Sequence, residues 1–336
     1  MTTSTPDTSE REIASGSDDP RILVPAGSEA PSLAFPIPTR EFALYSLSGP
    51  TPVADGICSL PFSSARYSRY KYGSVAAAEA FARALGTVLG ERHPELARAP
   101  KLLMTSSPYT YVPTAATTLA RRLRTVLNMT RARCGLPPAP LVQVDRISPV
   151  SGDYGTLSAQ ERDRLMAANT LSFRRFRPEQ VRDAHLLVID DVRVTGAHQR
   201  CLTRVTDALP LAARTFLYIA SFPSQAGACF DPTQEDALNH AAIKTLDDLA
   251  AIVESGDFAW NVRICKFVLN PANHGDLPRF LGRMPGWFVR GLYRNSSRDG
   301  YSRMGPYAPS HAVVRAELAR RNRRPVEAGP PRLESA

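Results

Sequence analysis

The sequence predicts an α/β protein with a mostly parallel central sheet flanked by helices and followed by a helical extension. Three observations support this prediction. Short apolar segments alternate with amphipathic stretches through the first two thirds of the chain, as strands and helices alternate around a parallel sheet. The alternation stops near residue 225, and helical periodicity predominates after it. Two acidic residues directly follow the most apolar strand, at the sheet edge where α/β proteins bind ligands.

The elements follow from apolar runs for the strands and from the 3.6-residue spacing of apolar positions for the helices. The predicted strands cover residues 41–47, 101–107, 140–147, 185–192 and 214–222. The predicted helices cover residues 74–89, 114–129, 158–168 and 196–209. Ser74 is a suitable N-cap for the first of these helices, and Pro113 stands directly before the second.

The two ends of the chain differ in composition from its middle. Residues 1–38 are rich in Ser, Thr, Asp and Pro, and both they and residues 321–336 predict disordered tails. Residues 39–225 form the predicted α/β domain, and residues 226–320 a mainly helical cap. Aromatic residues alternate with arginines in this cap. We expect Trp287, Phe288 and Leu292 to enter a core with the arginines outside; stacking on nucleic acid is the alternative.

Composition narrows the class of protein. The chain has 336 residues, of which 43% are hydrophobic and 22% charged, as in a globular protein with a sizeable core. It contains no run of 18 apolar residues and no apolar stretch near its start, so we expect a cytoplasmic protein without a membrane span. The five cysteines are scattered without a CxxC pair, which indicates reduced thiols. The net charge of +9, carried mostly by arginine, suits an anionic ligand.

The segment HLLVIDDVRVTGAHQR, residues 185–200, carries the strongest chemical signal. Asp190 and Asp191 end a buried strand, and the following turn would aim backbone N–H groups at a phosphate. Gly196 removes the side chain where the phosphate must come close. Carboxylates beside a phosphate cradle suit sugar hydroxyls or the shell of a magnesium ion. The cradle would consist of Val194, Thr195, Gly196, Ala197 and His198.

Two other interpretations of this segment, and a zinc site elsewhere in the chain, are less consistent with the sequence. The aspartates could simply cap the next helix, but two in succession before a Thr-Gly turn exceed what a cap needs. A Walker B strand would require a GxxxxGK[ST] motif, and the chain contains no Gly-Lys pair. The six histidines show neither HxH nor HExxH spacing, which argues against a zinc site.

The segment resembles the ribose-phosphate loop of the type I phosphoribosyltransferases. That pattern is an apolar strand, two acidic residues, two mostly aliphatic residues and a T-G-x-T turn. The matching positions are Asp190, Asp191, Val192, Thr195 and Gly196. This sequence departs from the pattern at Arg193, Val194 and His198.

Further marks resemble the ComF-like branch of this superfamily. The segment SRYKYGSVAAAEAFARAL, residues 68–85, is similar to its lysine-tyrosine-glycine segment before a helix. The branch's later marks occur in the same order, with a longer spacing between Arg162 and Asn169: Arg146, Leu157, Glu161, Arg162, Asn169 and Phe173. The resemblance covers about residues 42–222. The chain also looks similar to a divergent group of these domains that is associated with tellurite-resistance and stress gene neighbourhoods. The helical region has no counterpart in the minimal ComF-like domain.

The resemblance implies a type I phosphoribosyltransferase fold and an enzyme that uses 5-phosphoribosyl 1-diphosphate (PRPP) and Mg²⁺. The enzyme would transfer the phosphoribosyl group to a nitrogen acceptor, which the sequence leaves open. It implies that Asp190 and Asp191 hold the ribose hydroxyls and touch Mg²⁺ indirectly through its shell. Residues 194–198 would bind the 5′-phosphate.

The diphosphate would lie at the loop 106–114, with Ser106 and Ser107. This loop has no lysine or arginine, so we expect Arg146, or the arginines at 162, 174 and 175, to supply charge. Residues 148–156 would form a lid.

A non-catalytic protein of the same fold is the rival hypothesis. The altered turn and the uncharged diphosphate loop favour a nucleotide or PRPP sensor, whereas the intact aspartate pair favours catalysis. A nucleic-acid-associated module is a third hypothesis, based on the arginines of residues 279–332. A homodimer is compatible with each of the three.

Overall fold

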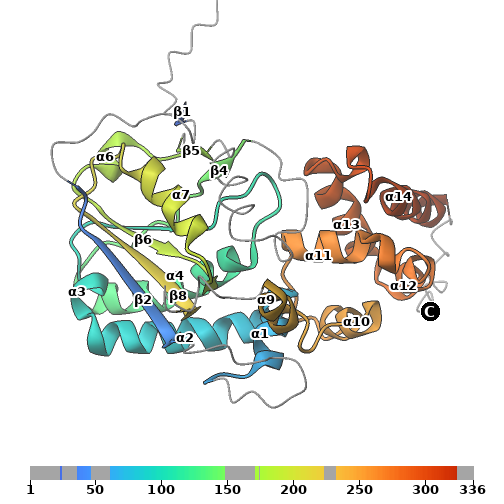
Figure 1. Ribbon diagram of the computed structural model, residues 1–336, viewed down its shortest axis with the longest axis horizontal. Coiled ribbons are helices and arrows are strands. Elements are labelled where there is room, and N and C mark those ends of the chain that lie inside the picture. Colours follow the sequence, from blue (N-terminus) through green and yellow to red (C-terminus); the bar gives the residue numbers. More distant parts are fainter. Residues whose placement is uncertain are drawn as a thin grey trace, which may run out of the picture.

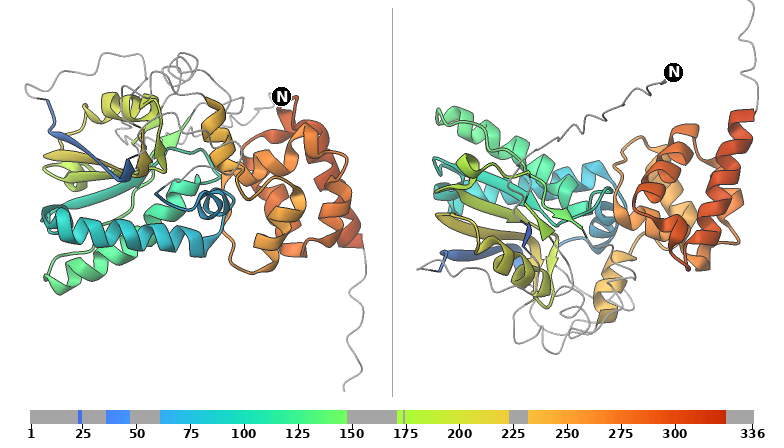
Figure 2. Two further views of the ribbon diagram at one scale, coloured as in Figure 1. Left: turned by 60° about the horizontal axis from the view of Figure 1, so that its bottom comes forward. Right: turned by 90° about the horizontal axis from the view of Figure 1, so that it is seen from above.

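The computed structural model describes residues 23–24, 36–46, 61–147, 171–173, 175–222 and 232–323. Figure 1 shows a sheet with its flanking helices on one side and a group of helices, α10 to α14, on the other. Both turned views in Figure 2 keep these two parts side by side. Among the helices of the described residues, none has the length and apolar content needed to span a bilayer.

The central sheet has the strand order β2-β8-β6-β3, and all neighbouring strands are parallel. A short fifth strand, β7, continues beyond β6 and pairs in parallel with β8. This confirms four of the predicted strands. Their observed bounds are Thr39–Ser46 for β2, Leu102–Ser106 for β3, His185–Ile189 for β6, Val192–Arg193 for β7 and Ala213–Ser221 for β8.

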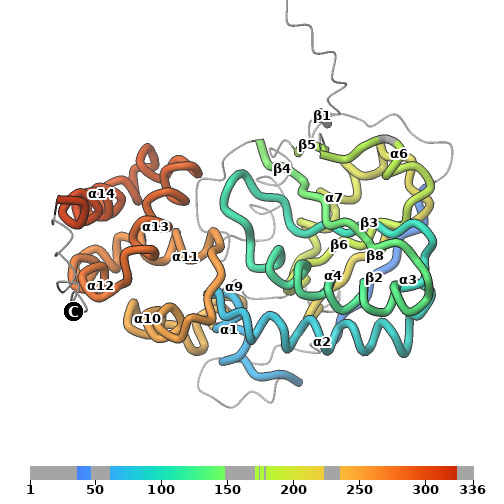
Figure 3. The backbone as a smooth tube through the Cα atoms, turned by 180° about the vertical axis from the view of Figure 1, so that it is seen from behind, coloured from blue at the N-terminus to red at the C-terminus, as the bar shows by residue number. Residues whose placement is uncertain are grey.

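Alternate residues of each central strand face opposite layers of helices. Leu187 and Ile189 of β6 enter the core that α2 and α4 share. Leu186 and Val188 enter the core on the other face, with α7. Burial on both faces explains why these strands read as nearly continuous apolar runs. The flanking helices are α1 (Ser64–Lys71), α2 (Val75–Arg92), α3 (Pro94–Ala97), α4 (Ala115–Arg133), α6 (Pro178–Val181) and α7 (Ala197–Thr206); Figure 3 shows α2 and α4 from behind.

The strand predicted at residues 140–147 is wrong over most of its length. Only Asp145–Arg146, β4, is a strand, and it belongs to a small antiparallel sheet with β1 (Leu23–Val24) and β5 (Leu171–Ser172). Leu141 makes a single parallel bridge to Met104 of β3. The Thr105 hydroxyl donates to the Val142 carbonyl at 2.8 Å. Further along, Asp145 makes another isolated parallel bridge, to Tyr109 in the loop after β3.

The remaining helices form a region with its own core. They are α9 (Pro232–Asn239), α10 (Leu246–Glu254), α11 (Val262–Leu269), α12 (Leu277–Arg283), α13 (Gly286–Arg298) and α14 (Ala308–Arg323), with the short 3₁₀ turns η2 (Pro271–Asn273) and η3 (Tyr301–Arg303). Phe288 and Leu292 are fully buried in this core, as predicted. Trp287 is not, because this residue is 44% exposed, although its ring contacts the Phe258 and Phe288 rings.

The helical region docks on the α/β part through the junction between α1 and α2. Tyr72, which ends α1, lies in the core of the helical region. Gly73 follows with a φ of +95° and accepts a backbone hydrogen bond from Ala259 at 2.8 Å. Ser74 caps α2 as predicted and also donates to Asp257 at 2.7 Å. The Lys-Tyr-Gly-Ser segment is therefore the seam between the two parts.

Replacement of Gly73 by alanine should open this seam. A Cβ there would lie 2.5 Å from the Ala259 carbonyl oxygen, on a backbone whose positive φ disfavours any side chain. We expect the Gly73→Ala variant to lose about 2 kcal/mol or more of unfolding free energy, measured by urea denaturation. Gly90→Ala in α2 is the matched control, because nothing lies within 4 Å of its Cβ, and it should be neutral or slightly stabilising. Equal stability of the two variants would contradict the role of Gly73.

Candidate functional site

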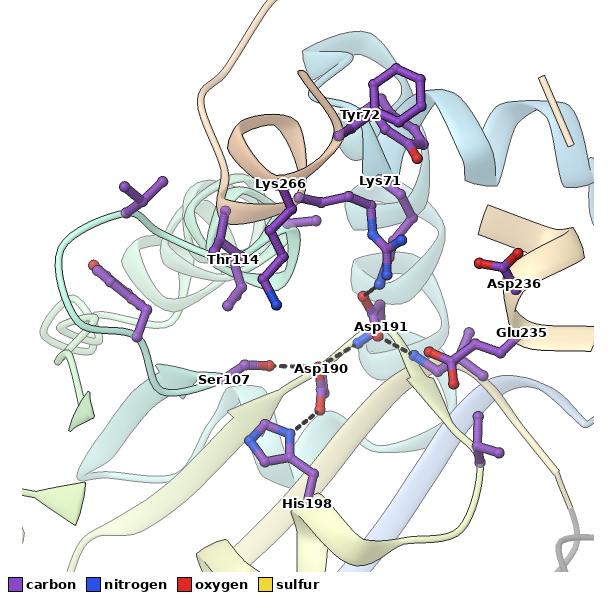
Figure 4. A pocket seen from close by; sticks show the side chains of 18 of the residues that line it. Lys71, Tyr72, Ser107, Thr114, Asp190, Asp191, His198, Glu235, Asp236 and Lys266 are labelled. Carbon is purple, nitrogen blue, oxygen red and sulfur yellow. Dashed lines mark hydrogen bonds and ion pairs between the residues drawn. The ribbon is translucent and has the colours of Figure 1, made fainter. Parts of the chain in front are cut away.

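A cavity of about 670 Å³ lies at the carboxyl ends of the parallel strands. The register places Ser106 and Ile189, the last residues of β3 and β6, side by side and level with Leu217 in the middle of β8. The loops that follow these strands therefore meet at one edge of the sheet. The far wall comes from the helical region, chiefly from α9, α11 and the segment around η3. Figure 4 shows the labelled side chains that point into this cavity.

Asp190 is held by three donors. Its Oδ1 accepts from the Ser107 hydroxyl at 2.6 Å and from the Asp191 N–H at 2.9 Å. Its Oδ2 is 2.7 Å from His198 Nδ1. Burial raises the pKa of this carboxyl, but the charge and hydrogen bond of His198, with the Ser107 and backbone donors, bring the pKa below its ordinary value. Asp190 is thus an ionised, oriented carboxylate.

Asp191 pairs with a different cation. Its Oδ2 accepts from Lys71 Nζ, and its Oδ1 accepts from the Val192 N–H at 2.8 Å. The exposed fractions of the Lys71 and Asp191 side chains are 9% and 16%, so the ion pair is largely shielded from water. The sequence alone does not predict this role of Lys71, which belongs to the segment similar to the lysine-tyrosine-glycine segment of the ComF-like branch. Its single sequence signal was that it is one of very few lysines in an arginine-rich chain.

The turn of residues 194–198 leads into α7 as predicted. Gly196 has a φ of +71° at the N-cap and offers no side-chain cap. All five residues of the turn line the cavity, and the buried Val194 also packs with Ala220 and Phe222. His198 uses Nδ1 for Asp190, and its buried Nε2 has no hydrogen-bond partner within the described part of the chain. That nitrogen is the atom of His198 that a ligand could still engage.

The loop after β3 separates its two predicted serines. Ser107 faces the cavity and donates to Asp190, but the Ser106 hydroxyl is 3.0 Å from that of Thr117 and lines a different groove. Further along the loop, the N–H groups of Tyr111 and Val112 donate to Asp299 Oδ1 at 3.1 and 3.3 Å. A carboxylate of the helical region therefore already occupies two backbone donors of this loop. Burial is the main cause of the raised pKa of Asp299.

The positive charge that the loop lacks comes from other elements. Lys266 of α11 points into the cavity toward the sheet edge that carries Asp190 (Figure 4). Arg146, predicted as a cation at a strand end, also lines the cavity, as does Arg263. Arg175 does not; it pairs with Asp145 at 3.2 Å and lines the other groove. Arg162, Arg174 and the predicted lid at 148–156 lie outside the described residues.

The fold is that of a phosphoribosyltransferase-like protein. The sequence matches the family described as PRTase ComF-like over residues 40–312, most of its length, and the chain belongs to that family. The match continues through the helical region, well beyond the segment of about 42–222 that carries the resemblance in the sequence. A comparison with curated proteins gives no match.

The Asp190–His198 pair predicts a specific response to acid. A carboxyl group whose pKa is lower in the folded than in the unfolded protein stabilises the fold at any pH above the unfolded pKa of about 3.9. This stabilisation is lost as the pH falls through the folded pKa. Replacing His198 by glutamine removes the imidazolium charge and raises the pKa of Asp190. We therefore expect His198→Gln to unfold at a higher pH than the unaltered protein, followed by circular dichroism.

His274→Gln is the control, since the partner of His274 Nδ1 is the Ser310 hydroxyl at 3.0 Å rather than a carboxylate. Identical acid midpoints for the two variants would argue against the assigned pairing.

Proposed function

We propose that this protein binds PRPP with Mg²⁺ and transfers its phosphoribosyl group to a nitrogen acceptor. The observation that carries the proposal is the pair Asp190–Asp191, which faces a cavity beside the uncapped start of α7 in a member of the ComF-like family. The carboxylates suit the two ribose hydroxyls, and the first N–H groups of α7 suit the 5′-phosphate. The chemical nature of the acceptor is left open.

The two carboxylates would also serve the reaction itself. Loss of diphosphate leaves a positive charge on the ribose ring, and fixed negative groups nearby stabilise that charge. The contacts with His198 and Lys71 orient both aspartates before the substrate enters. The ribose hydroxyls would then take over or share these contacts. No reorganisation of the strand end is needed, because Asp190 N and Asp191 O are already bonded to β8.

The diphosphate needs positive charge from outside its own loop. Asp299 already uses the N–H groups of Tyr111 and Val112, so these donors serve the docking of the helical region. Lys266 and Arg146 line the cavity from two other sides. We assign them to the diphosphate, which makes the helical region part of the substrate site.

The donor set fits a magnesium ion that enters with the substrate. Every carboxylate oxygen of Asp190 and Asp191 already has a hydrogen-bond donor, and the described residues hold no cluster of three metal-ligating side chains. Mg²⁺ commonly binds through substrate phosphates and water with only one or two carboxylates. Bound in this way, it would neutralise charge on the diphosphate, and Asp190 and Asp191 would meet its water shell.

A non-catalytic PRPP or nucleotide sensor is the second candidate. It is favoured by the ion pairs that engage both aspartates and by the packing of Val194 into the core in place of a hydroxyl residue. Release of diphosphate separates the two functions. An enzyme releases diphosphate when a suitable amine or base is supplied, whereas a sensor binds PRPP tightly and releases none across a broad acceptor panel.

The role of Asp191 can be separated from its contribution to stability. Asp191→Asn removes the partner of the ribose but also leaves the buried Lys71 without its counter-ion. This loss should cost about 3–5 kcal/mol of unfolding free energy. Lys71→Met combined with Asp191→Asn should recover much of the stability and still fail to bind PRPP with Mg²⁺ in calorimetry. PRPP affinity equal to that of the unaltered protein would exclude Asp191 from the ribose site.

The diphosphate assignment makes a prediction of its own. A charge-assisted contact to phosphate contributes about 1.5–3 kcal/mol. Lys266→Ala and Arg146→Ala should therefore each weaken PRPP binding by about ten- to a hundredfold, measured by calorimetry. Arg279→Ala, on the exposed surface of the helical region, is the control and should leave the affinity unchanged. If neither cavity variant weakens binding, the diphosphate lies elsewhere.

A further inference from the structure

A second groove, of about 800 Å³, lies on the other side of the loop 106–114. Its described lining contains no carboxylate residue, and it is rich in arginine, hydroxyl and amide side chains. The arginines are Arg121, Arg122, Arg124, Arg175 and Arg177. The neutral hydrogen-bonding residues are Ser106, Tyr109, Thr117, Thr118, Thr125, Gln143 and Gln180.

The arginines come from two separate walls. Three belong to α4, and the other two stand in the segment just before α6. Within the described residues, Arg121, Arg124 and Arg177 make no ion pair with a carboxylate. Several guanidinium groups around one concavity repel one another, and an anion bound between them relieves that repulsion. A solvated helix face would account for the arginines of α4, but not for the two arginines in the segment before α6.

Two of these arginines, one from each wall, act on the same side chain, Tyr109. Arg175 is fixed by Asp145, whose carboxylate also accepts from Gln143 at 2.7 Å and is almost fully buried. Burial raises the pKa of the Tyr109 hydroxyl, and both Arg121 and Arg175 act to lower it. Arginines of both walls therefore act on the same phenol, which lines the groove.

We propose that this groove is a second binding site, separate from the PRPP cavity, for a small ligand with two or more adjacent phosphates, such as a nucleoside triphosphate. Guanidinium groups bind phosphate oxygens in bidentate fashion. The volume suits a small molecule, since such sites usually measure about 300–1,000 Å³. Leu141 and Val142 add an apolar portion beside Tyr109. This site does not depend on the proposed transferase function.

A small ligand fits better than a nucleic-acid strand. Proteins that bind single strands usually present several aromatic rings on which successive bases stack. The described lining of this groove offers one aromatic ring, that of Tyr109. A single ring can contact one base, while the arginines of the two walls hold a short chain of phosphates between them.

The test is calorimetry of the full-length protein with ATP in two conditions. The first contains no Mg²⁺, and the second contains saturating PRPP with Mg²⁺. The unaltered protein should bind ATP in both conditions. The double variant Arg121→Ala/Arg124→Ala should bind ATP at least tenfold more weakly and keep its PRPP affinity. Arg133→Ala is the matched control, because it lies on the same helix α4 and does not line the groove; it should bind ATP normally. Thermal unfolding of the unaltered protein and of both variants verifies that each is folded.

Three results would overturn the proposal. The first is no ATP binding by the unaltered protein, or equal binding by the double variant and the Arg133 control. The second is competition between PRPP and ATP, which would place ATP in the main cavity. The third is tighter binding of a single-stranded oligonucleotide than of ATP with the same dependence on Arg121 and Arg124, which would assign the groove to nucleic acid.

Discussion

The buried ion pair between Lys71 and Asp191 is the interaction on which the arrangement of this protein depends. Removing two charges from water is costly, and their attraction offsets that cost only if both groups are held in place. Asp191 is fixed by the end of β6 and its bonds to β8. Lys71 is fixed at the end of α1, and its carbonyl accepts from Asn261 at 3.1 Å. The sheet edge, the α1–α2 junction and the helical region are thus tied at one point.

Adjacent aspartates repel each other when both are ionised. In this site each of the two aspartates pairs with a different side chain. His198, on the helix that follows the turn, faces Asp190, whereas Lys71 faces Asp191. Each carboxylate therefore has its own cation from a different element. The arrangement lets two negative groups stand side by side in a largely buried cavity, which is the property that a ribose site with a cationic transition state requires.

The helical region is a structural part of this site rather than an appendage. Tyr72 and Val112 of the α/β part lie in its core, and Asp299 binds the loop after β3 through two backbone donors. Lys266 of the same region supplies a cation to the cavity. The family match accordingly runs into α14, to residue 312.

The sequence by itself determined the parallel sheet, most of its strands and the Asp190–Asp191 edge, because strand periodicity and the acidic turn are local patterns that neighbouring residues specify. It also placed the Ser74 cap correctly. It failed at residues 140–147, where Leu141 makes only an isolated bridge to β3 and Asp145–Arg146 pairs with the distant strand β5. Only the tertiary structure decided that Lys71 meets Asp191 across 120 positions, that Asp299 fills the loop donors, and that arginines of α4 face Arg175 and Arg177. These contacts depend on how distant elements pack, and no local spacing encodes that packing.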